Sequence, residues 1–529
     1  MIREPLRVGV ALDDARSRRA PAWVARAIEY IQASAEARIV AILDRGPPPQ
    51  PSVARRAYDA LDRRLFRIAN DPLAAVAVDD RLAGVPIDLP ERARDHRLDV
   101  IIDFGAPPIA AAAARHGVWS YSFGDPLRDI LTRTPVTGSF VHDAEGNALY
   151  ESWARTDPVS LRRNRTSSHW KASTFAARLL RDLHRRGADA SAPRPHRVDR
   201  PAVAAAAGLR TFGRELLRDR ARRLVGRDPW VLAYRIDADR GPVPSASEDT
   251  ELTLLVPPLD RFWADPFVTP APDGWFLFLE ERCYDEPHAH ISVMHVDRAG
   301  RIGPPSRALA TPYHLSYPFV FAWSGSWWMI PETSRNRTVE LWRATEFPHR
   351  WVRERVLLED VIAVDATLIE HGGRWWMFCN VGERGASKDD ELHLFHATTP
   401  LGPWIPHSTN PTKSDVRSAR PAGRPWQVDG VWYRPAQDGS GGYGSRIVIH
   451  RIDRLDEQAF AETATGTLVA DERFVGLHTI NACDGLTVVD VRAWRPRYRL
   501  LERLDQLRSA GASSSPRPVK IVRTRASHV

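Results

Sequence analysis

The stretch WADPFV at 263–268, the turn DG at 273–274 and the run WFLF at 275–278 form the first copy of an internal repeat. Each copy joins one strand to an aromatic-rich strand through a short glycine-containing turn, which is typical of a tight β-hairpin. The repeat therefore predicts all-β structure over residues 230–495. Later copies open at SYPFV (316–320), VDATL (364–368), ARPAG (419–423) and HTIN (478–481).

The five copies are spaced roughly 50–60 residues apart, which leaves room for four strands in each, the size of a propeller blade. A β-sandwich would not repeat its sequence at this period. We therefore expect a five-bladed β-propeller at 230–495, with one strand of every blade converging on a central axis. The residues expected at the innermost positions are Asp265, Tyr317, Asp365, Arg420, and His478 or Thr479.

Residues 1–190 have a different texture, in which short apolar strands alternate with helical segments. The runs LRVGVAL (6–12), RIVAIL (38–43) and LDVIIDF (98–104) are typical of buried parallel strands. Apolar spacing predicts a helix over Ala22–Ala33 and an alanine-rich one over Pro108–Arg115. The alternation predicts an α/β domain with a parallel sheet. No GxGxxG motif follows the first strand, so a dinucleotide site is not expected.

Two further segments complete the expected organisation. Residues 191–229 are expected to be a linker with one Arg/Ala-rich helix, because prolines interrupt the chain before it. Residues 496–529 are basic and are expected to form a disordered tail.

The composition is that of a globular protein, with 43% hydrophobic and 26% charged residues. No apolar run reaches the ~18–20 residues that span a bilayer. The N-terminus lacks the pattern of a secretory signal, so we expect a cytoplasmic protein. The three cysteines form no CxxC pair, which argues against a disulfide framework.

The formal charge of +8 comes almost entirely from arginine, since only four of the 74 basic residues are lysine. Together with abundant alanine and proline, this usage indicates a GC-rich bacterial genome. The basic residues are spread along the chain, whereas nucleic-acid-binding proteins concentrate them on one face or arm. Nucleic acid is therefore not an expected partner.

A set of motifs in the second half resembles the N-terminal domain of the glucosamine inositolphosphorylceramide transferase family and its bacterial relatives. That domain is similar to the five-bladed propellers of arabinanases, β-xylosidases and fructosidases. The resemblance covers about residues 230–495. It rests on WADPF (263–267), SYPFVF (316–321), WMIPETS (328–334), VDATLIEHGGRWWMF (364–378), SARPAGRPW (418–426), YRPAQD (433–438) and HTIN (478–481).

Bacterial proteins of this kind carry a formyltransferase-like domain in front of the propeller. The segments GVWSYSFGD (117–125) and SLRRNR (160–165) look like the corresponding parts of such a domain. Where relatives have a His-His-Gly-Asp-like turn, this chain has Ser122-Phe123-Gly124-Asp125. Formyl transfer needs a histidine to move a proton, and phenylalanine cannot replace it. We therefore expect the domain to have lost this activity, with Asp125 serving as a cap for the next segment.

The resemblance to propeller glycosidases implies a funnel in which two carboxylates do acid and base work and a third tunes a pKa. Aligning the repeats places Tyr317 where the tuning aspartate would be and Asp365 where the general acid would be. The candidate catalytic residues are Asp265, Asp365 and Glu332. The candidate substrate-binding residues are Tyr317, Arg417, Arg420, Gln437, Asp438, His478 and Asn481.

No metal or cofactor is expected. His288 and His290, next to Asp285 and Glu286, lack matched ligands at zinc spacing and are expected in a solvated loop.

Three functions remain open from the sequence. The first is a carbohydrate-active enzyme of surface polysaccharide or glycoconjugate metabolism, which hydrolyses or transfers a glycosyl unit at the funnel, with a partner glycosyltransferase. The second is a non-catalytic protein that binds a sugar, nucleotide sugar or oligosaccharide. The third is a sugar N-formyltransferase. Two carboxyl groups ~5–10 Å apart in an open funnel would favour catalysis. Carboxylates that are each paired with arginine would favour binding.

Overall fold

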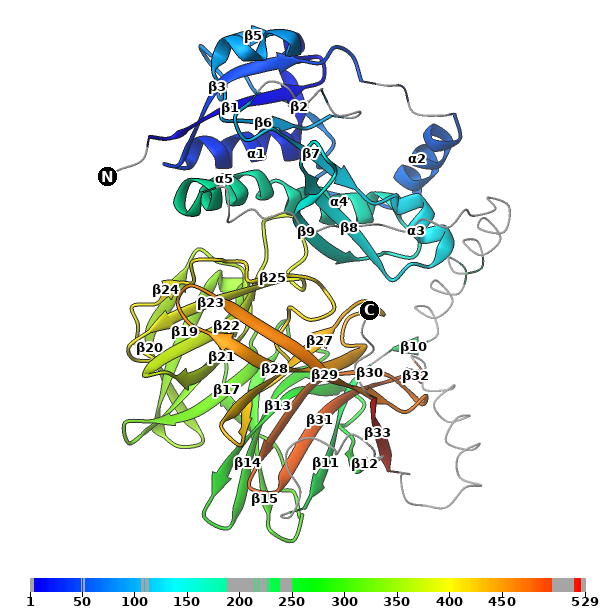
Figure 1. Cartoon of the computed structure of the whole chain (residues 1–529). Coiled ribbons are helices and arrows are strands. Elements are labelled where there is room, and N and C mark those ends of the chain that lie inside the picture. The colour runs from blue at the N-terminus through cyan, green and yellow to red at the C-terminus, as the bar shows by residue number, and fades with distance from the viewer. Residues whose placement is uncertain are drawn as a thin grey trace. The chain divides into compact units, whose positions relative to one another are not determined.

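The computed structural model separates the chain into two compact units (Figure 1). The first unit comprises residues 1–216 and 383–387, and the second comprises residues 217–382 and 388–529. Within these limits the structure describes residues 4–48, 50, 53–105, 109, 114–187, 214, 217, 226–227, 229–237, 250–496 and 518–524. The linker helix expected within 191–229 and the helix expected at 108–115 fall mostly outside the described residues.

The first unit is built on one seven-stranded sheet, in the order β5-β3-β1-β6-β7-β8-β9. The first five strands in this order run parallel, as the sequence predicts, whereas β8 and β9 extend the sheet as an antiparallel hairpin. The sheet is therefore mixed. Its strands are β1 (Leu6–Leu12), β3 (Ala37–Asp44), β5 (Ile87–Asp88), β6 (Val100–Asp103), β7 (Val118–Phe123), β8 (Val136–His142) and β9 (Ala148–Arg155).

The predicted helix α1 (Ala22–Ala33) forms with the expected bounds because Trp23, Ala27, Ile28 and Ile31 make one buried face. That face packs with α5 and the sheet in one hydrophobic core (Figure 1). The other elements are α2 (Val53–Leu65), α3 (Pro126–Thr132), α4 (Leu161–Ala172), α5 (Phe175–Arg186), β2 (Arg19–Pro21), β4 (Ala75–Ala77), η1 (Ala15–Ser17) and η2 (Pro90–His96).

The second unit is an all-β propeller, and its first three blades follow the sequence repeat. Each blade is an antiparallel sheet whose first strand lies innermost. The first blade has β13 (Arg261–Ala271), β14 (Gly274–Cys283), β15 (His290–Asp297) and β16 (Ser306–Leu309). The second has β17 (Ser316–Trp323), β18 (Ser326–Thr333), η4 (Ser334–Asn336), β19 (Thr338–Glu346) and β20 (Arg350–Glu359). The third has β21 (Ala363–His371), β22 (Arg374–Val381), β23 (Glu391–Ala397), β24 (Ile405–Pro406) and β25 (Lys413–Ser414).

The last two blades are joined into one nine-stranded sheet. The fourth blade has β26 (Trp426–Val428), β27 (Val431–Asp438), β28 (Arg446–Leu455) and β29 (Phe460–Ala470). The fifth blade combines β30 (Phe474–Cys483) and β31 (Leu486–Ala493) with β11 (Trp230–Ile236) and β12 (Thr250–Leu255), which come from the beginning of the unit. The ring is thus closed by strands from both ends of the unit.

A tail strand, β33 (Val519–Thr524), pairs on one edge with β29 and on the other with β12 (Figure 1). The expectation of a disordered tail is therefore wrong for these residues. Val519 and Ile521 are buried in the core of the last two blades, and this burial holds the strand in place. A short antiparallel pair joins β10 (Gly226–Arg227), which comes just before β11, to β32 (Arg495–Pro496), which comes just after β31.

The inner strands of four blades share a β-bulge at the same place in the repeat. The pairing skips residues 265–266, 317–318, 365–366 and 478–479. The first bulged residue has a positive φ in three blades: 49° at Asp265, 44° at Tyr317 and 56° at Asp365. Such backbone is strained for residues other than glycine, and bulges redirect side chains. The repeated sequence thus coincides with a repeated β-bulge in these four blades.

Among the described helices, none combines the length and the apolar character needed to cross a membrane.

Candidate functional site

The inner strands enclose an open cavity of about 800 Å³, here called the funnel. Four of the predicted site residues line it: Asp265, Glu332, Arg420 and His478. The funnel wall also carries four aromatic rings and further charged groups. The remaining lining residues are Trp230, Phe262, Glu280, Arg282, Pro287, His288, Tyr313, His314, Ser316, Arg335, Lys388, Asp389 and Tyr443.

Asp265 lies at the floor of the funnel and is bonded to two neighbouring blades. Its Oδ2 accepts from the backbone N–H of Tyr317 (3.2 Å) and its Oδ1 accepts from the hydroxyl of Thr479 (2.9 Å). Burial, together with the nearby charge of Glu280, raises the pKa of Asp265 to about 8, although His478 opposes this shift.

His478 connects Asp265 to a second buried carboxylate, Asp490. Its Nε2 lies 3.2 Å from Asp265 Oδ1 and its Nδ1 lies 2.8 Å from Asp490 Oδ2. Burial opposes the charged imidazolium, but the charges of Asp490 and Asp265 raise the pKa of His478 above its ordinary value. Asp265, His478 and Asp490 each offer one candidate ligand atom, and these atoms lie within 4.8 Å of one another, close enough to bind one cation.

Asp490 is a site residue that the sequence reading missed. It is 0% exposed, and its carboxylate accepts from the backbone N–H groups of Asp265, His478 and Thr479 at 2.9, 3.2 and 2.8 Å. It therefore fixes the inner strands of the first and fifth blades to each other. A signal was present, because Asp490 is the single charged residue in the otherwise uncharged and mostly apolar run LTVVDV (486–491).

Asp365 is enclosed beneath the funnel and paired with Arg420. The Arg420 guanidinium donates to it from Nε (2.6 Å) and Nη2 (3.3 Å), and Gln437 donates from Nε2 (3.2 Å). Arg420 also donates to Asp389 (2.5 Å) and lies 3.8 Å from Glu332. Asp365, only 1% exposed, is not among the residues that line the funnel. Burial raises its pKa to about 6 against the opposing effect of Arg420.

Glu332 stands at the end of β18 and faces the funnel as an ionised carboxylate. Its Oε1 accepts from Ser334 (2.6 Å) and from Lys388 (3.2 Å). Burial would raise its pKa, but Lys388 and Arg420 hold the pKa of Glu332 below its ordinary value. Asp265 and Glu332 thus line one cavity with pKa values shifted in opposite directions.

The other predicted binding residues have different surroundings. Tyr317 is buried below the floor, where its hydroxyl accepts from the backbone N–H of Gly423 (2.8 Å) and lies 2.9 Å from Thr367 Oγ1. Gln437 supports Asp365 from below. Arg417 donates to Asp415 (2.7 Å), and Asp438 lies 3.4 Å from Arg446. None of these four residues lines the funnel.

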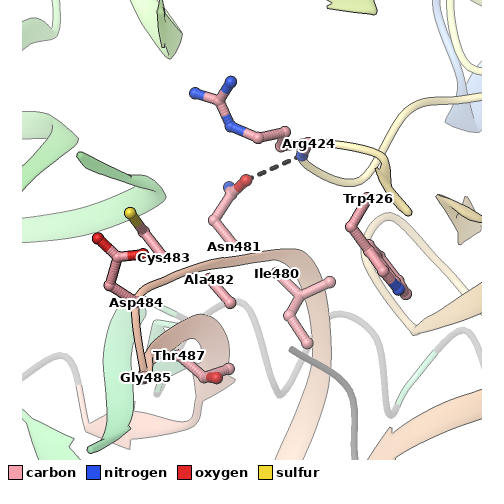
Figure 2. Close-up of a pocket in the computed structure, with 9 residues that line it drawn as sticks. All are labelled: Arg424, Trp426, Ile480, Asn481, Ala482, Cys483, Asp484, Gly485 and Thr487. Carbon is pink, nitrogen blue, oxygen red and sulfur yellow. Dashed lines mark hydrogen bonds between the residues drawn. The ribbon is translucent and has the colours of Figure 1, made fainter. Parts of the chain in front are cut away.

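Asn481, which the repeat predicts in the funnel, lines a separate cavity of about 140 Å³ (Figure 2). Its Oδ1 accepts from the backbone N–H of Arg424 (2.8 Å) and its Nδ2 donates to the carbonyl of Pro266 (2.6 Å). Asn481 therefore ties three blades together. The repeat gave its position on the inner strand but not the depth at which its side chain lies.

Aromatic residues of the funnel wall were also missed. Trp230 stacks on the His478 ring with centroids 4.0 Å apart, and Tyr443 approaches the same ring at 5.3 Å. Arg420 lies 4.9 Å from the Tyr443 ring centroid. Trp230 belongs to β11, which lies outside the strand–turn–strand copies, so its place in the fifth blade was not visible in the repeat.

The solvated loop expected for His288 and His290 is wrong for His290, whereas His288 lies in the loop between β14 and β15 and is half-buried. His290 begins β15 and is buried, with Nε2 3.3 Å from Glu281 and Nδ1 3.4 Å from Glu286. His288 lines the funnel. The apolar alternation of β15 draws His290 into the blade, where Glu281 satisfies it.

In the first unit, the turn expected to have lost catalysis has structural roles. Ser122 Oγ lies 2.6 Å from His142 Nε2, and the Phe123 ring stacks on His169 with centroids 3.9 Å apart. Asp125 caps α3 by accepting from the backbone N–H of Arg128 (3.3 Å), as the sequence predicts.

Comparison with known proteins supports the resemblance read from the motifs. Residues 256–487 match the family model of glucosamine inositolphosphorylceramide transferase 1, N-terminal. The protein of that name from Oryza sativa subsp. japonica is 36% identical over 206 residues, which are 38% of this chain and 28% of the rice protein. The one from Arabidopsis thaliana is 35% identical and is covered to 27%. The chain thus spans little more than a quarter of the length of these curated relatives.

Solved structures similar to the chain include an exo-1,5-α-L-arabinanase from a bovine ruminal metagenomic library, with 13% identity and a TM-score of 0.32. The match covers 53% of this chain and 99% of that one. Another is Zg3597, a family 117 glycoside hydrolase of Zobellia galactanivorans, with 12% identity, a TM-score of 0.30, and coverage of 50% and 90%.

The motifs, the blade architecture and the family match agree on the same part of the chain. Over residues 256–487 the chain is similar to the N-terminal domain of glucosamine inositolphosphorylceramide transferase 1.

Proposed function

We propose that the second unit binds a carbohydrate in its funnel, within a protein of glycoconjugate metabolism. The lining carries the proposal: charged donors and acceptors alternate with the rings of Trp230, Phe262, Tyr313 and Tyr443 around one open cavity. Sugars present hydroxyl groups on their edges and apolar C–H faces, so they need both kinds of contact. The family match supports a role in glycoconjugate chemistry.

Binding without hydrolysis is the version of this proposal that the ion pairs favour. A propeller glycosidase would need a second carboxylate free to work beside Asp265. Asp365, the aligned candidate, lies beneath the funnel with Arg420 and Gln437 bonded to its oxygens. A carboxylate paired in this way positions Arg420 at the floor rather than serving as an acid.

Glycosyl hydrolysis or transfer is the second candidate, and one observation favours it. The pKa of Asp265 is raised and that of Glu332 is lowered in the same cavity. Pairs of carboxyl groups whose pKa values are pushed apart are typical of acid–base catalysis. In this version Asp265 donates a proton to the leaving oxygen and Glu332 assists a nucleophile or stabilises positive charge.

Titration calorimetry with nucleotide sugars and with oligosaccharides of glucosamine, arabinose and xylose tests the proposal. We expect saturable binding that Asp265→Asn and Glu332→Gln weaken roughly tenfold each, since a lost hydrogen bond to a charged group is worth about 1.5–3 kcal/mol. Glu354→Gln, an exposed carboxylate of β20 paired with Arg343, is the control and should bind normally.

Turnover of the same sugars separates the two candidates. A binding protein forms no product with any variant. A catalyst forms product, and Asp265→Asn lowers its rate by about 10²-fold or more while changing affinity less. If no sugar binds and Asp265→Asn only lowers the melting temperature, Asp265 is a structural anchor and the proposal fails.

Two further assignments accompany this proposal. The curated relatives are longer and are named transferases, which supports a partner glycosyltransferase for this chain. The first unit retains a parallel sheet, but Ser122 and Phe123 stand where formyl transfer would need histidine, so sugar N-formylation is the weaker alternative.

A further inference from the structure

The separate cavity of about 140 Å³ points to a second binding site in the propeller (Figure 2). It shares no lining residue with the funnel. It is bounded by the inner strand of the fourth blade and by the hairpin of the fifth blade. Its lining residues are Arg424, Trp426, Ile480, Asn481, Ala482, Cys483, Asp484, Gly485 and Thr487.

The backbone around Arg424 is fixed by contacts with other blades. Gly423 has a φ of 127°, and a Cβ there would lie 2.0 Å from the carbonyl oxygen of Ile480, so glycine is required. The next N–H, that of Arg424, donates to Asn481 Oδ1 (Figure 2). The path of the chain thus determines where the Arg424 side chain begins.

The Arg424 guanidinium has few partners for a half-buried cation. Its Nη2 donates to the carbonyl of Val320, and its Cζ lies 4.7 Å from the Phe319 ring centroid. Among the described residues no carboxylate lies within ion-pair distance of it. A guanidinium has five N–H donors, and burial lowers the pKa of Arg424 below its ordinary value.

Arg420, four residues earlier on the same segment, provides the contrast. It is paired with Asp365 and Asp389, and Glu332 lies 3.8 Å away. A desolvated charge normally has such compensation, because leaving it unpaired is strongly unfavourable. Arg424 is half-buried, and none of its nitrogens is among the enclosed polar atoms that lack a partner, so the carbonyl of Val320 and solvent take that part beside the open cavity that it lines.

We propose that Arg424 binds a small oxyanion, the carboxylate or phosphate group of a small molecule, in this cavity. The planar guanidinium matches the two oxygens of such a group. Asp484 also lines the cavity, and Figure 2 shows its carboxylate beside Cys483 rather than toward the Arg424 guanidinium. Its negative charge weakens anion binding. Because the two cavities share no lining residue, this site is independent of the sugar proposed in the funnel.

Thermal unfolding at constant ionic strength and pH 7 tests the site, with chloride replaced by inorganic phosphate or by acetate. We expect the wild-type melting temperature to rise saturably, by about 4 °C at 100 times the dissociation constant. Arg424→Gln should remove this rise. Arg350→Gln, which removes an exposed charge paired with Glu346, should keep it. The phosphate and acetate arms show which oxyanion is preferred.

Two more variants keep the result interpretable. Asp484→Asn should increase the affinity for the anion severalfold, and Arg424→Lys should weaken binding without abolishing it, because the charge stays and the planar fork is lost. Phosphorus NMR provides a direct check: folded Arg424→Gln protein should broaden the line of inorganic phosphate less than wild-type protein does. Equal stabilisation of wild type and Arg424→Gln, or no response of the wild type to either anion, overturns the proposal.

Discussion

Asp265 makes the stability of the second unit depend on pH. Its folded pKa of about 8 lies above its ordinary value of 3.8, so between these values the folded state holds a proton that the unfolded chain releases. The free energy of unfolding should therefore fall as the pH rises through this range. The raised pKa of His478 acts in the same direction, because its extra stability is lost as the pH rises through the folded pKa.

We expect Asp265→Asn to flatten this dependence, since the amide does not titrate. Urea unfolding of both proteins from pH 5 to pH 9 measures the effect. Parallel stability curves for wild type and variant would show that the Asp265 carboxyl is ionised in the folded protein.

Arg420 and Arg417 offer a matched pair of arginines. Arg420→Met should destabilise the protein by about 3–5 kcal/mol, because it leaves the buried carboxylate of Asp365 uncompensated. Arg417→Met removes a partly exposed pair with Asp415 and should cost about 0–1 kcal/mol. Denaturant unfolding measures both, and adding Asp365→Asn to Arg420→Met should recover part of the loss. Equal losses in the two single variants would contradict this account.

At the residue scale, the repeat could predict inner-strand positions but not which of their side chains line the funnel. Asp265, Arg420 and His478 occupy equivalent places in three blades, so one alignment brought them together. Asp365 occupies the same place, yet it lies under the funnel, because its depth depends on the side chain of Arg420. Asp490 could not be found in this way, since it lies on the second strand of its blade, where the other blades have no matching carboxylate.

At the scale of elements, β33 should contribute strongly to stability. Ile521 is 1% exposed and pairs with Thr250 on one side and Ala470 on the other. Ile521→Ala should cost about 2–5 kcal/mol through lost burial and the cavity left behind. Lys520→Ala, on the exposed face of the same strand, should change stability by less than about 0.5 kcal/mol.

Chemical denaturation of the two variants decides the question, with the change in midpoint as the readout. Similar, small effects of both substitutions would mean that the strand contributes little to the folded state.

The tail strand carried a signal that other features outweighed. The segment VKIVRT (519–524) begins with apolar and polar residues in alternation, which is typical of a strand with one buried face. Its basic character favoured a disordered tail. Its partners, β29 and β12, are far apart in the sequence, so pairing with both could not be inferred from local pattern.

For the whole molecule, we expect no formyl transfer by the full chain. Ser122, Phe123 and Asp125 are used in contacts with His142, His169 and the start of α3, and Phe123 cannot move a proton. Incubation with formyl-tetrahydrofolate and a panel of amino sugars, followed by mass spectrometry, should show unchanged sugar. Detection of formylated sugar would contradict this prediction and would identify the chain as a sugar N-formyltransferase.

The fifth blade combines strands from both ends of the unit, so it cannot form until both ends have been synthesised. Its β11 leaves the ribosome early, whereas β30 and β31 are made about 250 residues later. At about 5–20 residues per second, this gap lasts roughly 12–50 s. During that interval Trp230 is present without His478, so the nascent chain has four blades' worth of sequence and no finished funnel. Ligand recognition at the funnel is therefore a property that the chain acquires only after β30 and β31 have been made.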